Sequence, residues 1–546
     1  MKRFSEIAPC SLFKKKTLAL VAIWSYLFSL SWVLPLALGN RSVVFCFVVA
    51  LVFVVPIAFV TLCVMAVLDV VAASLRDKEL FGGGALNKRG LKSWVVLVSF
   101  VVVWGVVFLI MYPGCCSPDS NDVFKMVLGL PFESNHFRYD QINNHHPVSY
   151  VFLIWCVFQF GASLGLSQAM CVGLVSATHL LLLAVCLTVF IVKVFELSNS
   201  KGVFIFAWVF FLFNPLIAQY SVTVWKDVLF AGFFLVFLVE IALLVLRPEL
   251  FWGKRSNVAF LVGSGILCIL FRNNAILAIG ITLVVLVALK SKFRKRLAII
   301  ATAILLPAVI VVGPLYSALH IQSGHFSEAL AVPLQQVSRT IAQGGSLSAE
   351  QEAFFNEILP IDQYEERYLP SSPNPIKFSE DFDDDFLEEN KVQFLINWFQ
   401  VGCINPGIYL RAWLAETQVF WNIAYPTWYT VPAGYSFDGN AVSHNHLSGV
   451  IDQSDFDSIR ELYIQIFEPI FNIGVLAWLL LFVLMYQVCR RNYKIVLCLM
   501  PLLLLWFSFL IAAPANDFRY MFPLHLAVPL LLLLLVWTKD SGSREA

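Results

Sequence analysis

Long runs of apolar residues dominate the chain, and short polar segments separate them. An α-helix rises 1.5 Å per residue, so about 20 apolar residues span the roughly 30 Å hydrocarbon layer of a bilayer. Runs of this size recur along almost the whole sequence. We predict about twelve transmembrane helices, at 17–38, 43–70, 93–113, 170–195, 203–221, 228–246, 257–271, 275–290, 297–316, 463–488, 495–513 and 522–538.

The short loops that carry Lys and Arg set the predicted orientation, because basic loops stay on the cytoplasmic side. Segments such as "KSKFRKR" and "CRRNYK" fall on that side together only if the apolar segment 148–168 does not cross the membrane. We therefore predict that this segment is interfacial or re-entrant. The run 17–38 is longer than the apolar core of a signal peptide, so we expect it to remain as the first membrane helix.

This orientation divides the chain into four parts. Residues 1–92 are expected to hold N-terminal membrane helices and a cytoplasmic loop, and 93–316 a membrane module with an external loop at 114–147. Residues 317–462 form an external insert, and 463–546 hold the C-terminal membrane helices. The predicted fold class is an all-α polytopic membrane protein with a mostly helical external insert.

The insert has its own helix signals. Ser348 precedes "AEQEAFFNEILP" and suits an N-cap, so a short helix is expected at 347–360. The stretch "KVQFLINWFQVGCINPGIYLRAWLAETQVFWNIAY" predicts two amphipathic helices joined at "INPG", rich in aromatic residues that suit the membrane interface. The acidic run 379–390 is most simply a solvated connector, with a metal site as the alternative.

Composition supports the membrane class. Of the 546 residues, 59% are hydrophobic and 13% are charged, which is far from the usage of soluble globular domains. The formal net charge of +1, without an exposed basic patch, argues against a nucleic-acid partner. Most of the twelve cysteines lie inside apolar runs and are expected to pack as small hydrophobes. Cys115 and Cys116 are adjacent, which leaves a redox or disulfide role as an alternative.

Acidic and imidazole side chains gather in the first large external loop. Asp119 and Asp122 directly follow the apolar run 93–113, and His145 and His146 end the loop. A lone Asp at such a place often only marks the membrane interface. Asp and His together can deprotonate a hydroxyl or hold a divalent cation.

The other external turns supply positive charge. Lys226 ends the turn "SVTVWK", Arg272 lies between two apolar runs, and Arg519 is near the last one. A basic side chain in the bilayer is costly and needs a partner or an anion. Taken singly, each fits an ion pair that fixes helix packing; on the same face as Asp119, together they favour a shared anionic ligand. The polar residues next to them that we include in the candidate site are Asp227, Asn273 and Tyr520.

The common nucleotide and hydrolase motifs do not occur in a suitable context. "FGGGAL" lacks the Lys-Ser or Lys-Thr of a phosphate-binding loop, and no GxSxG or HExxH pattern is present. Chemistry driven by ATP is therefore not expected.

The set of motifs resembles the GT-C superfamily of membrane glycosyltransferases, and more closely a bacterial family of uncharacterised membrane proteins grouped with it. The resemblance covers roughly residues 93–525. It rests on segments that occur in order along the chain, namely "YPGCCSPDS", "NNHHPVSY", "NPLIAQYSVTVWKDVLFA", "FRNNA", "PLQQVSRTIAQGGSLSAEQEAF", "NPIKF" and "NPGIYLRAWL".

The resemblance implies a transfer of sugar from a polyprenyl-phosphate-linked donor, on the external face of the cell membrane. The acceptor would be a glycan, a lipid or a protein of the cell envelope. Asp119 matches the acidic residue that acts as general base or orients the acceptor, with Asp122 beside it. His145 and His146 match an element near the donor phosphate or a metal, which leaves open a divalent cation such as Mg²⁺ or Mn²⁺. The cations expected around the lipid phosphate are Lys226, Arg272, Arg339 and Arg519.

A transporter or flippase of a lipid-linked or anionic solute is the alternative from another class. It would also have about twelve helices and a few charges within the membrane. Inverted halves with paired broken helices near the midplane would be its expected signature. The polar residues here gather on one face instead, and a large external insert interrupts the helices.

Overall fold

The structure is a computed structural model that describes most of the chain. The described residues are 14–39, 41–77, 92–130, 132–134, 137–139, 142–427, 429, 433–436, 441–442, 444–512 and 515–537. The basic loop at 78–91 and the tail after 537, on which part of the predicted orientation rests, lie outside these ranges.

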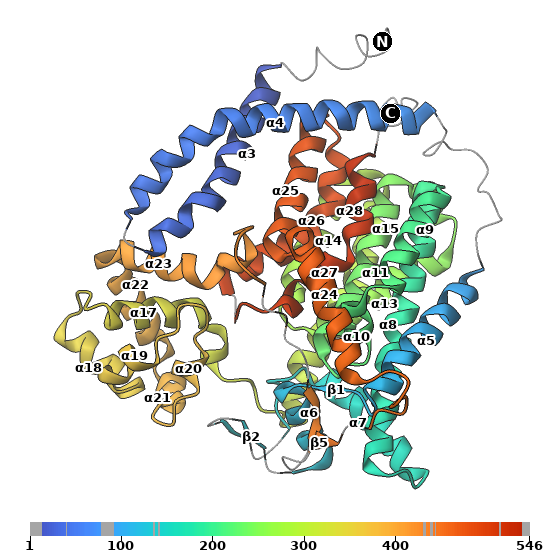
Figure 1. The fold of residues 1–546 in the computed structure, drawn as a ribbon. Helices are drawn as coiled ribbons and strands as arrows, with labels where there is room; N and C mark the ends of the chain where they lie inside the picture. The colour runs from blue at the N-terminus through green and yellow to red at the C-terminus, as the bar shows by residue number, and fades with distance from the viewer. Residues whose placement is uncertain are drawn as a thin grey trace.

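The described part of the chain is a bundle of apolar helices with a smaller helical body at one side (Figure 1). Among the described residues, eight helices are long and apolar enough to cross a membrane, or up to ten if two bent pairs each form one span. The chain is therefore a helical polytopic membrane protein, as expected. Each of the twelve predicted ranges coincides with a helix or a bent pair, but two of the matching helices have only 17 and 15 residues, so the count of twelve is not established.

The N-terminal part is a helical hairpin that leans on the bundle. It consists of α3 (Lys15–Val33), a 3₁₀ turn η1 (Leu34–Leu38) and α4 (Val43–Asp77). Helix α4 forms an arch over the bundle in Figure 1, and valines along it such as Val52 and Val55 are mostly exposed. The carboxylate of Asp69 on α4 accepts hydrogen bonds from the hydroxyl of Tyr486 at 2.6 Å and from Arg490. This buried polar contact attaches the hairpin to the C-terminal helices.

The membrane module follows as a series of helices that traverse the bundle. They are α5 (Ser93–Ile110), α6 (Pro118–Leu128), α7 (Val148–Ser163), α8 (Gln168–Ser198), α9 (Lys201–Leu212), α10 (Pro215–Ser221), α11 (Lys226–Leu246), α12 (Pro248–Trp252), α13 (Arg255–Phe271), α14 (Ala275–Leu289), η2 (Ser291–Phe293), α15 (Arg294–Ile310), the π-helical turn η3 (Val311–Leu315) and α16 (Tyr316–Ala318). Helices α9 and α10 meet at a bend of 64°. Helix α7, in the segment predicted not to cross, has only 16 residues and is shorter than the candidate spans.

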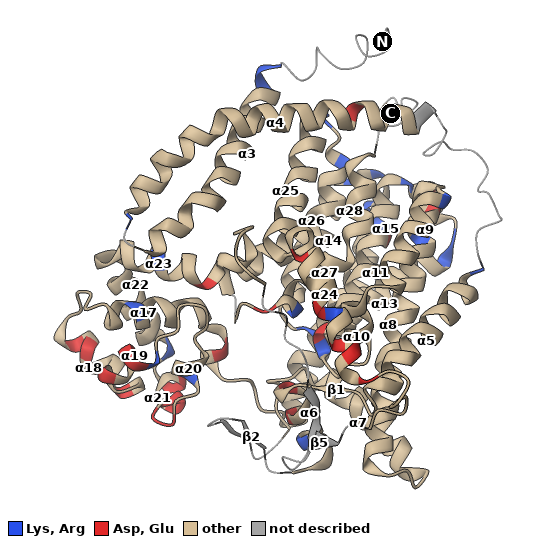
Figure 2. Cartoon of the chain, in the orientation of Figure 1, with Lys and Arg blue, Asp and Glu red and all other residues tan. Residues whose placement is uncertain are grey.

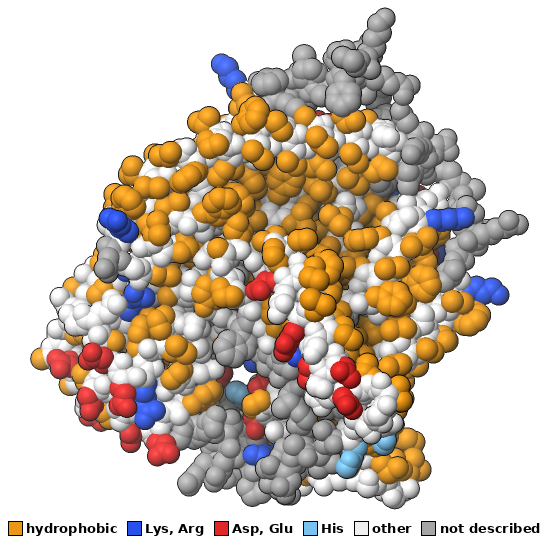
Figure 3. All heavy atoms as spheres, in the orientation of Figure 1, with side chains coloured by type: hydrophobic (Ala, Val, Ile, Leu, Met, Phe, Trp, Pro, Cys, Tyr) orange, Lys and Arg blue, Asp and Glu red, His pale blue; other side chains and the backbone are white. Residues whose placement is uncertain are grey.

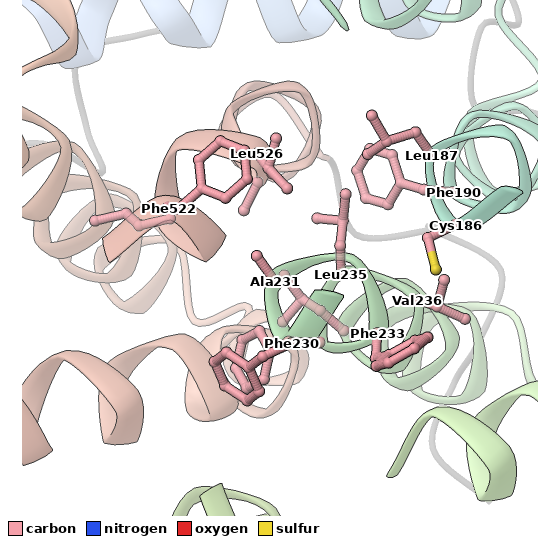
Figure 4. Close-up of a cluster of buried hydrophobic side chains, with 14 of the residues drawn as sticks. Cys186, Leu187, Phe190, Phe230, Ala231, Phe233, Leu235, Val236, Phe522 and Leu526 are labelled. Carbon is pink, nitrogen blue, oxygen red and sulfur yellow. The ribbon is translucent and has the colours of Figure 1, made fainter. Parts of the chain in front are cut away.

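Helix α11 is the centre of the bundle. All its residues from Asp227 to Leu246 are buried, and it packs against α8, α13, α26 (Tyr493–Ala512) and α27 (Phe522–Leu526). Its sequence is apolar on every side, which is typical of a helix enclosed by others rather than of one with a single buried stripe. Figure 4 shows Phe230, Phe233 and Leu235 of this helix among side chains from α8 and α27. The ends of α11 are thereby held in fixed positions.

The insert is a helical body with its own core. Its elements are η4 (Phe326–Ala329), α17 (Ala331–Ala342), α18 (Ala349–Ile358), α19 (Ile361–Arg367), α20 (Asn374–Lys377), α21 (Asp384–Glu389), α22 (Lys391–Ile404), α23 (Pro406–Thr417) and η5 (Gln418–Phe420). The expected N-cap is confirmed, since the Ser348 hydroxyl accepts the backbone N–H of Gln351. The two helices joined at "INPG" are confirmed as α22 and α23.

The acidic run of the insert is not the connector that we predicted. Residues Asp384–Glu389 form helix α21, and the side chain of Asp383 caps its first turn by accepting the N–H of Phe386. Leu387 is fully buried in the core of the insert, which pulls the run onto the body. The apolar residues among the carboxylates, Phe382, Phe386 and Leu387, all pack in or against this core and outweigh the polar pattern around them.

The C-terminal part completes the bundle. It contains α24 (Gln453–Phe471), α25 (Ile473–Cys489), α26, η6 (Phe518–Met521), α27 and α28 (Val528–Leu535). The η6–α27 segment meets α28 at a bend of 47°.

Short strands depart from the predicted all-helical fold. Strands β1 (Cys115–Cys116), β4 (Ala433–Ser436) and β5 (Ala441–Val442) form an antiparallel sheet in the order β1, β4, β5. Strands β2 (Phe132–Ser134) and β3 (Phe137–Tyr139) form a second antiparallel pair. Since β1 directly precedes α6, the first sheet ties the end of the insert to the loop that carries Asp119.

Charged residues and apolar surface are distributed unevenly. In Figure 2, Lys and Arg gather at the end of the bundle near α9 and α15, and Asp and Glu concentrate on α18, α19 and α21. Figure 3 shows hydrophobic side chains over the upper half of the molecule and acidic side chains over the insert. The hydrophobic surface over the upper half of the molecule is suited to contact with lipid.

Candidate functional site

Helix α6 places the two candidate carboxylates at one end of the bundle. It begins with a capping box, in which the Ser117 hydroxyl accepts the N–H of Ser120 and the Ser120 hydroxyl accepts the N–H of Ser117. It ends at Gly129, whose φ of 64° is left-handed and suits glycine. Asp119 and Asp122 are three residues apart, so they lie on the same face of this helix.

Hydrogen bonds fix α6 against the start of α11. The Ser120 hydroxyl donates to the carbonyl of Val224 at 2.7 Å, and the indole N–H of Trp225 donates to the Ser117 hydroxyl. The backbone of Cys115 also forms a bridge with Thr223. The loop that carries Asp119 and the turn before Lys226 are therefore held side by side.

An ion pair joins the loop that carries Asp119 to the last helices. Nη1 of Arg519, on η6, lies 2.7 Å from Oδ2 of Asp119, and its Nη2 donates to the Tyr520 hydroxyl at 3.0 Å. Asp517 accepts a weaker ion-pair contact from Nε at 3.3 Å, and the indole ring of Trp225 lies under the guanidinium at 5.1 Å. The Asp119 side chain is 33% exposed, so the pair borders open space.

A second ion pair lies deeper. Nη1 of Arg272 donates to Oδ1 of Asp227 at 2.6 Å, and both side chains are largely buried. The guanidinium of Arg272 stacks over the rings of Phe509 and Tyr520, so Tyr520 contacts both arginines. The Asn273 side-chain oxygen is buried and has no hydrogen-bond partner within the described residues. This pair fixes α11 to the end of α13. It fits the interpretation that Arg272 forms an ion pair that stabilises helix packing.

The two histidines differ in their partners. His146 is buried, and its Nδ1 lies 3.0 Å from the Nζ of Lys226. Because the ammonium is the donor, the imidazole proton lies on Nε2, which has no hydrogen-bond partner in the described part of the chain. The ring of His145 meets that of His146 edge to face at 4.7 Å. His146 therefore presents an unused N–H next to Lys226.

The charges around the two aspartates shift their pKa values in opposite directions. Burial alone would raise the pKa of Asp119, but the positive charges of Arg519 and Lys226 outweigh burial and hold that pKa well below its usual range. Burial and the negative charge of Asp119 raise the pKa of Asp122 to about 7. Burial, followed by the charge of Lys226, lowers the pKa of His146 well below its usual value. At neutral pH one carboxylate is a fixed anion and the other titrates.

The insert contributes two residues that the sequence did not indicate. The backbone N–H of Asn144 donates to Gln322 at 2.8 Å, which brings the start of the insert against His145. Glu328 lies there with the ammonium of Lys377 at 2.6 Å. Burial would raise the pKa of Glu328, but the charges of Lys377 and His145 lower it. Lys377 belongs to the "NPIKF" motif, which was a usable signal, whereas nothing in the spacing of Glu328 pointed to it.

Arg339 is not brought to this group. It is buried on α17, where its guanidinium contacts the side chains of Gln343 and Tyr368 and the carbonyl of Arg411. All these partners lie within the insert. Cys115 and Cys116 are both free and buried, and no disulfide joins them. The contacts described above bring the other predicted site residues together around the starts of α6 and α11, the end of α13 and η6.

The residues of the group do not fit a divalent cation. Within the described ranges, no three side chains of His, Cys, Asp or Glu stand close enough to hold a metal ion. Arg519 lies against the carboxylate of Asp119, and Lys226 lies against Nδ1 of His146, so two of the expected donors already face cations. A divalent cation would be repelled by these two charges.

Fold and site together define a polytopic helical membrane protein with paired carboxylates and cations at one end of its bundle. Residues 138–546 match DUF6020, a family of unknown function, and the chain belongs to this family. The match includes Lys226, Arg272 and Arg519 and begins after Asp119. No curated protein and no solved structure matches the sequence.

Proposed function

We propose that this protein is a membrane glycosyltransferase of the GT-C type. It transfers a sugar from a polyprenyl-phosphate-linked donor to an acceptor in a cell-envelope glycan, glycolipid or protein. The observation that carries the proposal is the contact of Asp119 with Arg519, beside Lys226 and His146, at one end of an apolar bundle. Such a site offers a carboxylate to an acceptor hydroxyl and cations to a lipid phosphate.

Binding of the donor would change the state of Asp119. Without substrate, Arg519 neutralises this carboxylate and makes it a weak base. A donor phosphate that pairs with Arg519 and Lys226 would compete for their charge, so the pKa of Asp119 would rise toward the range of a useful base. The unused N–H of His146 is a further donor for a phosphate oxygen. The site is thus activated by the substrate that it acts on.

In the proposed reaction the acceptor oxygen attacks the anomeric carbon while the bond from that carbon to the phosphate oxygen breaks. The acceptor proton passes to Asp119, and Asp122, with a pKa of about 7, is the neighbouring group that can carry it to solvent. Polyprenyl phosphate leaves as an anion stabilised by Arg519 and Lys226. No step uses a divalent cation, because the donors do not fit one.

The proposed topology has twelve spans, with α7 interfacial or re-entrant and the Asp119 group on the external face of the cell membrane. Support comes from the basic residues near α9 and α15, which lie at the end of the bundle opposite the site (Figure 2). Helices α13 and α14 would then be two short spans. The lipid tail of the donor would lie along the apolar surface of the bundle.

Asp119→Asn tests the proposal. Full-length protein in liposomes is given a labelled polyprenyl-phosphate sugar and extracted envelope acceptor, and transfer of label is measured. We expect the variant to lose activity by about 10²–10⁴-fold, the usual contribution of a general base. Asp457→Asn is the matched control, because Asp457 is 32% exposed and pairs with Arg460 at 2.5 Å. The control should retain transfer.

Two results would contradict the proposal. One is full transfer by the Asp119→Asn variant with normal thermal unfolding, which would remove Asp119 from the reaction. The other is movement of the labelled lipid or an anionic solute across the liposome membrane without any sugar transfer by the wild type. The second result would favour the transporter or flippase class.

A further inference from the structure

A cavity lies between three helices at the end of the bundle away from Asp119. It has a volume of about 300 Å³ and is lined by the start of α5, the second half of α8 and the start of α13. The volume is in the range of small-molecule sites. Helix α13 runs from this cavity to Arg272, and α11 runs from Asp227 toward it, so the two sites are separated by the length of a membrane helix.

The wall of the cavity changes from polar to apolar along the helices. Ser93 and Ser256 lie at the starts of α5 and α13, where the rim is polar. Farther along these helices the lining is apolar and includes Val185, Val189 and Phe260, of which Val185 and Phe260 are exposed on the surface of the bundle. This order matches the change from headgroup region to hydrocarbon in a bilayer leaflet. An amphipathic lipid would meet matching surroundings at both of its ends.

Lysines dominate the accessible charge at the rim. Lys254 is 52% exposed, while its partner Glu196, at 2.5 Å, is 13% exposed. Glu196 also accepts from Lys193 at 3.0 Å, so this carboxylate is shared by two cations. Glu240 lies 3.7 Å from Lys193, is fully buried and is not part of the lining. Among the described lining residues a headgroup amine would therefore find no free carboxylate, whereas a phosphate would find Lys254.

Two further cations strengthen this preference. Lys92 directly precedes Ser93, Arg255 directly follows Lys254, and both are exposed. Basic pockets between membrane helices are known binding places for anionic headgroups, and each nearby Lys or Arg adds about 1 kcal/mol of attraction. The hydroxyls of Ser93 and Ser256 supply hydrogen-bond donors beside these charges.

We propose that this cavity, between α5, α8 and α13, binds one anionic phospholipid of the adjacent leaflet. Its phosphate lies at Lys254, Ser93 and Ser256. One acyl chain lies against Val185, Val189 and Phe260. The site is independent of the proposed sugar transfer, because it lies at the other end of the bundle and shares no residue with the Asp119 group.

Lipid binding to the purified full-length protein tests the proposal. The protein is delipidated in detergent and titrated by native mass spectrometry with phosphatidylglycerol, with phosphatidylcholine of the same chains, and with glycerol phosphate. We expect phosphatidylglycerol to bind at least about fivefold more tightly than phosphatidylcholine, as one lysine contact provides. Glycerol phosphate, which lacks chains, should not bind at the same concentrations.

Variants locate the binding in the cavity. Val189→Trp fills the apolar part and Ser256→Trp covers the exposed rim, and each should reduce phosphatidylglycerol binding at least tenfold. Lys254→Ser should reduce it about fivefold and weaken the preference over phosphatidylcholine, while Lys92 and Arg255 remain. The controls are Val209→Trp on the exposed face of α9 and Lys201→Ser at its start, which should bind as the wild type does.

Several results would overturn the proposal. Unchanged binding in Ser256→Trp would place the lipid elsewhere, even if Val189→Trp failed to fold. Equal affinity for phosphatidylcholine would remove the role of the cations. Equal affinity for glycerol phosphate would make the cavity a site for free phosphate compounds rather than for a lipid.

Discussion

Asp119 and Asp122 occupy one face of one helix, yet their surroundings give them opposite properties. Arg519 reaches Asp119 from the last helices and keeps it ionised. Burial and the negative charge of Asp119 raise the pKa of Asp122 to about 7. Two carboxylates with separated pKa values are a common arrangement where one holds charge and the other exchanges a proton.

This asymmetry predicts a pH-dependent stability. The folded protein holds the Asp122 proton up to about pH 7, whereas the unfolded chain loses it near pH 3.8. Asp122 therefore stabilises the fold below about pH 4, and this contribution is lost as the pH rises to about 7. Asp122→Asn removes the titration, so its stability relative to the wild type should rise across this window, by at most about 1.4 kcal/mol per pH unit.

Thermal unfolding of both proteins in detergent between pH 4 and pH 8 measures the effect. The difference in midpoint should grow up to about pH 7 and then level off. The control is Asp362→Asn, an exposed carboxylate on α19 of the insert. A difference between wild type and Asp122→Asn that is the same at every pH would show that Asp122 is not perturbed.

Among the elements, α25 is fixed by the close approach of its first turn to the backbone of Asn422, just after η5. A Cβ added at Gly474 would lie 2.5 Å from the carbonyl oxygen and 2.7 Å from the carbonyl carbon of Asn422. The side chain of Asn472 also caps α25 and donates to the carbonyl of Ile423 at 2.8 Å. The start of this span is therefore packed on backbone that cannot rotate away.

Gly474→Ala should lower the free energy of unfolding by about 1–3 kcal/mol, the usual cost of overpacking. Gly263 in the middle of α13 is the matched control, since a Cβ there meets nothing within 4 Å. Gly263→Ala should leave stability unchanged or raise it by up to about 1 kcal/mol, because alanine favours the helix. Thermal unfolding midpoints of the purified Gly474→Ala and Gly263→Ala variants measure the difference. Equal midpoints for the two variants would show that α25 can move away from Asn422.

At the scale of the whole molecule, the proposed orientation predicts which loops face the outside. Cysteines introduced at Ser291, between α14 and α15, and at Tyr493, at the start of α26, should be protected from a membrane-impermeant maleimide on intact cells. A cysteine at Glu352 on α18 should react. The three positions are exposed in the fold, so protection reports on the membrane rather than on burial. The background chain has its native cysteines replaced.

Permeabilised cells provide the control, since all three cysteines should react there. Labelling of Ser291→Cys and Tyr493→Cys from outside would overturn the proposed orientation. Labelling of only one of these two positions would contradict the twelve-span topology, because both loops are placed on the same side.

Much of the fold could be predicted because its causes are local. A run of apolar residues of bilayer length must form a helix, because in lipid a single segment can pair all its backbone N–H and C=O groups only in that conformation. The cap at Ser348 and the break at "INPG" are also local, and α18, α22 and α23 follow from them. The short strands around Cys115 were missed because their pairing joins segments more than three hundred residues apart.

The candidate site divides in the same way. The pattern of the chain was sufficient to place Asp119, Lys226 and Arg519 at ends of membrane helices, because polar residues between apolar runs must lie at the bilayer surface. Which charges meet was decided by tertiary packing: Arg519 reaches Asp119, and Arg339 remains inside the insert. Glu328 enters the site only because the insert folds back onto His145. Helix formation depends on neighbours in sequence, whereas charge pairing depends on neighbours in space.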